Sequence, residues 1–170
     1  MARDHTNPAA IAWKIRAFRA ADAPAITEIL RDSNEAARWP PESYARLAGL
    51  PGGVFLVCEA NSQPVGFVAA RQAADEAEIL NIAVHRDFRR KGVASALLLA
   101  ALDEFPRSAV VNVFLELRES NLAARALYER HGFVPSGRRK AYYHSPTEDA
   151  LCMMRKLRGT PDAKLPDLPS

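Results

Sequence analysis

A short basic turn joins an apolar strand to an apolar helix between residues 81 and 98, which read NIAVHRDFRRKGVASALL. Within it, the eight residues HRDFRRKG contain four Lys and Arg side chains and a glycine. Cations at the start of a helix are unfavourable without an anion, because that end of the helix already carries partial positive charge. The junction therefore predicts a strand followed directly by a helix, with either a site for an anionic ligand or a solvated run of charge between them.

The turn itself fits the pattern [Q/R]-x-x-G-x-[G/A] at residues 89–94. Gly92 and Ala94 are small enough for a phosphate group to approach the backbone N–H groups that open the helix. Neither the G-K-[ST] of a Walker loop nor the G-x-G-x-x-G of a dinucleotide site is present here. The pattern favours a pyrophosphate-binding turn, and a solvated charge run remains the alternative.

Hydrophobic periodicity predicts alternating strands and helices along the rest of the chain. Strands are expected at 13–18, 54–60, 65–71, 78–84, 110–117 and 150–157, with a short one at 133–134. Helices are expected after Asp22 and at 42–47, 93–104 and 122–131. An antiparallel meander thus precedes a strand–helix–strand–helix–strand order, which predicts α/β layers around a mixed central sheet.

Length and composition narrow the class of protein. The chain has 170 residues and a net charge of +3, which suits an anionic ligand but is too weak to indicate nucleic acid. Cys58 and Cys152 are expected to be small buried residues, since two distant cysteines form neither a disulfide framework nor a metal site. From this cysteine usage we expect a reducing, cytoplasmic setting, and no apolar run is long enough for a membrane span. One domain is expected over 13–158, between flexible tails at 1–12 and 159–170.

A second informative segment, LELRESNLAARALYERHGF, covers residues 115–133. Glu116 lies near the end of an apolar strand, and Asn121 opens the following helix with Ala124 and Tyr128 on one face. A glutamate in this place is a candidate acid–base group, although an exposed edge charge is the commoner role. The tyrosine is either a wall of a narrow site or ordinary packing.

These segments together resemble the GNAT superfamily of N-acetyltransferases, and more narrowly the RimI-type enzymes that acetylate the N-terminus of a ribosomal protein. The matching residues are NIAV (81–84), RRKGVA (89–94), the run from 115 to 133 and AYYHSPTEDALCM (141–153). The resemblance covers roughly residues 13 to 157. It implies a mixed, mostly antiparallel sheet of six to seven strands, about four flanking helices and a V-shaped split between two central strands.

The resemblance also implies acetyl-CoA as the acetyl donor, with no metal, lying between the strands at 79–84 and 110–117. Glu116 would be the general base and Tyr128 the general acid, and the backbone N–H of Val84 would stabilise the oxyanion. The implied contacts to acetyl-CoA come from Ile82, Ala83, Val84, Arg89, Arg90, Lys91, Gly92, Val93, Ala94, Ser95, Asn121, Ala124 and Tyr128.

By the same resemblance, the acceptor would lie between residues 31–44 and a loop at 137–146. Trp39, Tyr142 and Tyr143 are the candidate contacts. A protein N-terminus is the expected acceptor, and a small amine such as an antibiotic, a polyamine or an amino acid is the alternative. A non-catalytic acetyl-CoA sensor or a nucleic-acid-binding module is a third possibility, but cations gathered at one helix start argue against nucleic acid. Both a monomer and a homodimer remain open.

Overall fold

One mixed sheet forms the centre of the structure, a computed structural model that describes residues 12–33, 35–106 and 109–157. Its strands are β1 (Trp13–Ala17), β2 (Gly53–Ala60), β3 (Gln63–Ala73), β4 (Glu76–Val84), β5 (Asn112–Arg118), β6 (Val134–His144) and β7 (Thr147–Lys156). The α-helices are α1 (Ala23–Arg31), α2 (Pro41–Gly49), α3 (Val93–Glu104) and α4 (Leu122–Arg130), with 3-10 turns η1 (Ala20–Asp22) and η2 (Arg86–Phe88). The expected tails fall almost entirely outside the described residues.

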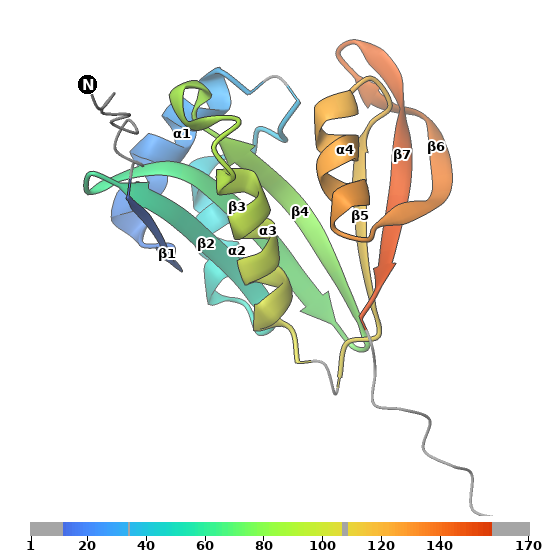
Figure 1. The fold of residues 1–170 in the computed structure, drawn as a ribbon, viewed down its shortest axis with the longest axis horizontal. Coiled ribbons are helices and arrows are strands. Elements are labelled where there is room, and N and C mark those ends of the chain that lie inside the picture. Colours follow the sequence, from blue (N-terminus) through green and yellow to red (C-terminus); the bar gives the residue numbers. More distant parts are fainter. Residues whose placement is uncertain (1–11, 34, 107–108, 158–170) are drawn as a thin grey trace, which may run out of the picture.

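The seven strands lie in the order β1-β2-β3-β4-β5-β7-β6. Only β4 and β5 pair in parallel, and every other neighbouring pair is antiparallel. Parallel neighbours need a crossover connection, and α3 supplies it between β4 and β5. The predicted fold class, with its mixed and mostly antiparallel sheet and about four helices, is confirmed (Figure 1).

Two apolar clusters hold the helices against the sheet. On one face, α3 and α4 bury Val93, Leu97 and Tyr128 against alternate residues of the strands. On the other, α1 and α2 bury Ile26 and Tyr44 against a second set of strand residues. Strand side chains alternate between the faces, so β5 directs its odd-numbered residues toward α3 and α4 and its even-numbered ones, including Glu116, to the opposite face.

The prediction of a loop at 137–146 is wrong, because most of these residues belong to strand β6. β6 is the edge strand of the sheet, and nearly all of its residues are exposed. A strand that is exposed to solvent on both faces does not alternate between apolar and polar residues. That alternation marks half-buried strands, and it is absent from GRRKAYYH. The hairpin formed by β6 and β7 therefore projects these residues beside the end of β5.

Within the described residues, none of the helices has the length and apolar character needed to cross a membrane.

Candidate active site

The two parallel strands at the middle of the sheet pair over only part of their length. Pairing runs from Glu76 opposite Asn112 to Ile79 opposite Leu115, and beyond it β4 and β5 diverge (Figure 1). A register shift against β3 falls at this point, because Ala69 faces Asn81 while Ala70 faces Ile79, which leaves Leu80 as an extra residue. Such a bulge bends its strand. The bulge accounts for the V-shaped split that the resemblance implied.

Beyond the bulge, the backbone of β4 presents alternate peptide groups to the split. The N–H of His85 bonds to the carbonyl of Val65, which makes Val84 and Gly66 a non-hydrogen-bonded pair of the antiparallel ladder. The N–H and C=O of Val84 therefore point away from β3, and those of Ile82 do the same two residues earlier. Ala83 lies between Ile82 and Val84, so its N–H and C=O point toward β3. They are therefore not placed for the contact with acetyl-CoA that was expected of Ala83.

Gly92 opens helix α3 in the left-handed conformation, with φ of 83°. A Cβ built on it would meet no atom within 4 Å, so the space beside its backbone is open. No side chain caps the first turn of α3, which leaves the N-terminal N–H groups at Val93 to Ser95 without a side-chain acceptor. An open approach, uncapped amides and the helix dipole together fit a phosphate group.

The three cations before Gly92 are not equivalent. Arg89 donates to the carbonyl of Val84 (3.0 Å) and to that of Asp32 (2.7 Å), so protein acceptors occupy its guanidinium. Arg90 adopts a positive φ of 62° and is exposed. Lys91 is exposed as well, with its Nζ 5.3 Å from the centre of the Phe88 ring. Arg89 therefore holds the turn against α1, whereas Arg90 and Lys91 remain the cations available to an anionic ligand.

Helix α3 is also linked to α4 through Ser95. Its Oγ lies 2.5 Å from Nε2 of His131, just beyond the end of α4. Burial, and then the nearby charges of Arg155 and Arg130, lower the pKa of His131. A neutral imidazole can accept a hydrogen bond from the serine hydroxyl, so this contact ties the two helices together on the face where the split opens.

Glu116 lies on β5 just past the last pair with β4, on the face opposite α3 and α4. Its Oε1 is 2.8 Å from Nε of Arg139, and Glu116 is the main cause of a raised pKa for Tyr142. The rings of Tyr142 and Tyr143 meet edge to face, with centres 5.2 Å apart. The predicted base and two of the predicted acceptor contacts therefore lie together.

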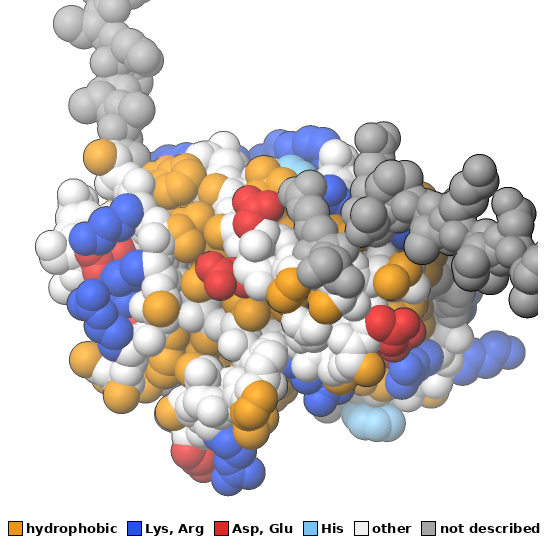
Figure 2. All heavy atoms as spheres, turned by 90° about the horizontal axis from the view of Figure 1, so that it is seen from below, with side chains coloured by type: hydrophobic (Ala, Val, Ile, Leu, Met, Phe, Trp, Pro, Cys, Tyr) orange, Lys and Arg blue, Asp and Glu red, His pale blue; other side chains and the backbone are white. Residues whose placement is uncertain are grey.

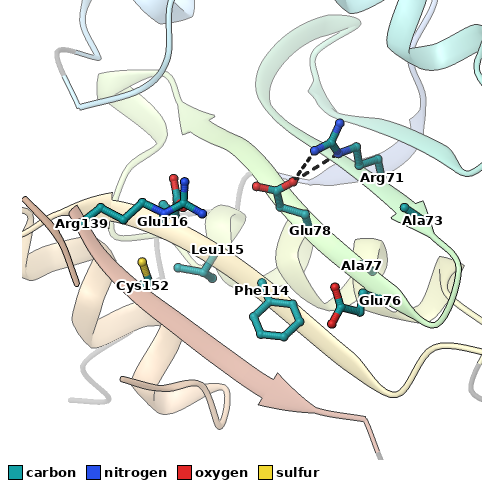
Figure 3. Close-up of a pocket in the computed structure, with 10 residues that line it drawn as sticks. All are labelled: Arg71, Ala73, Glu76, Ala77, Glu78, Phe114, Leu115, Glu116, Arg139 and Cys152. Carbon is teal, nitrogen blue, oxygen red and sulfur yellow. Dashed lines mark hydrogen bonds and ion pairs between the residues drawn. The ribbon is translucent and has the colours of Figure 1, made fainter. Parts of the chain in front are cut away.

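A cavity of about 360 Å³ extends from Glu116 along the same face of the sheet. Figure 3 shows Glu116 and Arg139 on one side, the ion pair of Arg71 with Glu78 across from them, and the ring of Phe114 below, beside Glu76. Cys152 lines the cavity near Glu116 and is half-buried, whereas Cys58 is fully buried as expected.

Tyr128 of α4 is buried, and its ring packs edge to face on Phe133 at 5.7 Å. Burial, followed by the nearby Tyr143, raises the pKa of Tyr128 well above its usual value, so the phenol is protonated at neutral pH. Asn121 caps α4, accepting from the N–H of Ala124 through its Oδ1 at 3.0 Å. Its side-chain NH₂ group is the part that remains for an external ligand.

Arg118 lies within the segment 115–133, but the sequence indicated no role for it. Its guanidinium donates to the carbonyls of Ser145 (3.3 Å) and Pro146 (3.2 Å), pairs with Glu148 (3.2 Å) and stacks 4.3 Å from the centre of the Tyr143 ring. The sequence around Arg118 could not predict this role, because its partners lie some thirty residues further along the chain. Arg118 fixes the end of the β6–β7 hairpin beside Glu116.

Asn81 on β4 anchors the segment between α1 and α2 by a side-chain hydrogen bond. The buried Asn81 donates to the carbonyl of Ala37 at 2.8 Å, and Tyr44 bonds to the same carbonyl at 3.2 Å. Trp39 packs on Tyr44, with ring centres 5.4 Å apart, and is half-buried there. A role for Trp39 in contacting an acceptor stays a prediction, and its packing gives it a structural role as well.

The sequence model of the Acetyltransferase (GNAT) family matches residues 23–133, which is most of the chain. The chain belongs to the GNAT family of acetyltransferases.

Individual GNAT proteins resemble the chain over nearly their whole length. The [ribosomal protein bS18]-alanine N-acetyltransferase of Escherichia coli K12 is 34% identical over 141 residues, which cover 82% of this chain and 94% of that enzyme. The crystal structure of the ribosomal-protein-S18-alanine N-acetyltransferase from Escherichia coli superposes with a TM-score of 0.78 at 30% identity, covering 91% of this chain and 99% of that one. The RimI-type resemblance is confirmed.

A more distant GNAT structure shares the fold alone. Arabidopsis thaliana NAA60, solved in complex with acetyl-CoA, superposes with a TM-score of 0.76 at 19% identity, covering 87% of this chain and all of that one. The chain therefore shares its overall fold with a protein that was solved with acetyl-CoA bound.

Proposed function

We propose that this GNAT protein transfers the acetyl group of acetyl-CoA to the N-terminal α-amine of a protein, with a ribosomal protein of the bS18 type as the substrate. The observation that carries the proposal is the cluster of Glu116, Tyr142 and Tyr143 at the mouth of the β4–β5 split. It occurs in a chain that covers 94% of an enzyme named for this reaction.

The residues around the split fit coenzyme A. Uncapped amides at the start of α3, with Arg90 and Lys91 beside them, would hold the pyrophosphate, and the open space at Gly92 admits it. The peptide groups of Ile82 that point into the split would pair with the amide-bearing arm. The NH₂ of Asn121 would contact the same arm. When bound, acetyl-CoA supplies the thioester on which the amine acts.

Glu116 would act on the acceptor amine. An α-ammonium group has a pKa of about 7.7–8.0, so at neutral pH most of it carries a proton and is not nucleophilic. The carboxylate of Glu116 takes this proton, directly or through a water molecule, and the freed amine attacks the thioester carbonyl. The N–H of Val84 points into the split and would stabilise the oxyanion that forms.

Tyr128 would complete the transfer. Its phenol is protonated at neutral pH and can give its proton to the departing thiolate of coenzyme A, and the proton that the nitrogen loses as the amide forms would restore the phenol. A thiol has a pKa near 8.5, so the thiolate is already a moderate leaving group and the help required is small. No covalent intermediate on the protein is needed.

The acceptor side suits an extended peptide better than a compact amine. The β6–β7 hairpin, fixed by Arg118, places two tyrosines at Glu116, and hydroxyl and ring edges of this kind can grip a peptide backbone. A small amine remains the alternative acceptor, because the cavity of about 360 Å³ is large enough for one.

Binding of nucleic acid at the basic turn is less well supported. Figure 2 shows the face away from this turn, and on it Lys and Arg side chains stand in separate groups among acidic and hydrophobic ones, without one continuous basic patch. Elsewhere, two of the three cations on β6 are paired, Arg138 with Glu119 and Arg139 with Glu116.

The test is a panel of acceptors assayed by release of free coenzyme A. A peptide with the N-terminal residues of bS18 and a free terminal alanine should be acetylated with a far higher kcat/KM than spermidine, an aminoglycoside or free alanine. The same peptide with an acetylated N-terminus should be inert. A higher kcat/KM for a small amine than for the peptide would support the alternative, a small-molecule acetyltransferase. Tight binding of acetyl-CoA without turnover of any acceptor would indicate a non-catalytic acetyl-CoA sensor.

Replacement of Tyr128 by Phe tests the proposed acid. We expect kcat to fall about tenfold, which is less than the 10²- to 10⁴-fold typical of acid catalysis because the thiolate leaves readily, with little change in acetyl-CoA affinity. The control is the melting temperature of Tyr128→Phe, which should stay close to that of the wild type so that a fall in kcat does not come from a loss of folded protein. Steady-state kinetics and titration calorimetry measure kcat and the affinity, and an unchanged kcat in Tyr128→Phe would remove the hydroxyl from the mechanism.

A further inference from the structure

The carboxylate that serves as the proposed base is already paired with a side chain of the edge strand β6. Nε of Arg139 lies 2.8 Å from Oε1 of Glu116, and the same carboxylate is the main cause of a raised pKa for the neighbouring Tyr142. The Glu116 side chain is only 18% exposed. Figure 3 shows the Arg139 guanidinium lying directly beside Glu116 at the end of the cavity.

An incoming ammonium group needs the same oxygens. A carboxylate offers about four lone pairs, and the positions best suited to a cation are those that a guanidinium takes. Both groups carry one positive charge, so exchanging one for the other leaves the net charge of the site unchanged. We propose that the guanidinium of Arg139 occupies the acceptor's place on Glu116 and that the acceptor ammonium displaces it on binding. This inference rests on the proposed function.

The position of Arg139 allows that exchange. Its side chain is 61% exposed and comes from the edge of the sheet, where only β7 holds the strand. The ladder is irregular directly after it, with a register shift between Arg139 and Tyr143 and a positive φ of 49° at Ala141. An ion pair with so exposed a partner is weak, so an acceptor can replace it at small cost.

A second resting place for the guanidinium is close by. The Cζ of Arg139 already lies 5.5 Å from the centre of the Tyr142 ring, within the range of a cation–π contact. Released from Glu116, Arg139 keeps this contact while the ammonium takes the carboxylate. The arginine thus competes with the acceptor and sets its apparent affinity, without taking part in acetyl transfer.

Replacement of Arg139 by Gln tests the competition. We expect the KM for the bS18 peptide to fall roughly two- to fivefold, the range that an exposed ion pair allows, while the KM for acetyl-CoA stays unchanged. Arg138→Gln is the matched control: it removes the same charge from the neighbouring residue, whose partner is Glu119. Methylguanidinium should inhibit Arg139→Gln competitively with the peptide, and inhibit the wild type less.

The outcomes separate the two proposals. No acetylation of the peptide by the wild-type protein would contradict the proposed function and this inference with it. Peptide turnover by the wild type, with a peptide KM that is unchanged or higher in Arg139→Gln, would overturn the role of Arg139 alone. A fall in KM shared equally by Arg138→Gln would also overturn it, because the effect would then come from surface charge in general.

Discussion

Glu116→Gln lowers kcat for the peptide by about 10²- to 10⁴-fold, the range that a positioned general base contributes. The change keeps the size of the side chain, but an amide cannot take the proton of the acceptor ammonium. The deficit should narrow above about pH 8, because the acceptor amine then loses its proton to water. A pH–rate profile of both proteins, taken at saturating acetyl-CoA, measures the effect.

The control is Glu119→Gln, which removes a carboxylate three residues along the chain that pairs with Arg138. Its kcat should stay within about twofold of the wild type, since surface charges away from a site have small effects. Acetyl-CoA affinity should be the same in all three proteins. If Glu116→Gln and the wild type give identical profiles, another group removes the proton and Glu116 has no part in the mechanism.

Gly92→Glu lowers the affinity for acetyl-CoA roughly a hundredfold or more. The new side chain fills the open space beside the backbone of Gly92, and its carboxylate would meet the pyrophosphate at the start of α3. Placing like charges together costs several kcal/mol, and each 1.4 kcal/mol is a tenfold change in Kd. Isothermal titration calorimetry with acetyl-CoA measures the loss directly.

Backbone strain is the other consequence of changing Gly92, and two further variants isolate it. Gly92→Asn keeps a residue that tolerates the φ of 83°, and should bind acetyl-CoA several times more tightly than Gly92→Glu. Gly92→Ala adds strain of about 1–2 kcal/mol without a charge. An affinity of Gly92→Glu equal to that of the wild type would show that the pyrophosphate binds elsewhere, and the proposed donor site would be wrong.

Local patterns accounted for most of the elements. The helix expected at 93–104 begins and ends as α3 does, because its apolar repeat and the preceding glycine mark both its face and its start. Strands β2 to β5 were found from runs of apolar residues, with boundaries displaced by a few residues. β6 was predicted only as a short strand at 133–134, since an exposed edge strand leaves no apolar alternation to detect.

The sequence by itself determined the alternation of strands and helices and, through its resemblance, the family, and it predicts a phosphate-binding turn at Gly92. Tertiary structure alone decided the bulge at Leu80 that opens the split, the use of Arg89 to hold its own loop, and the pairing of Arg139 with Glu116. The reason is physical: periodicity and turn chemistry act between neighbours in the chain. Strand register and ion pairs between distant segments exist only once the sheet has brought those segments together.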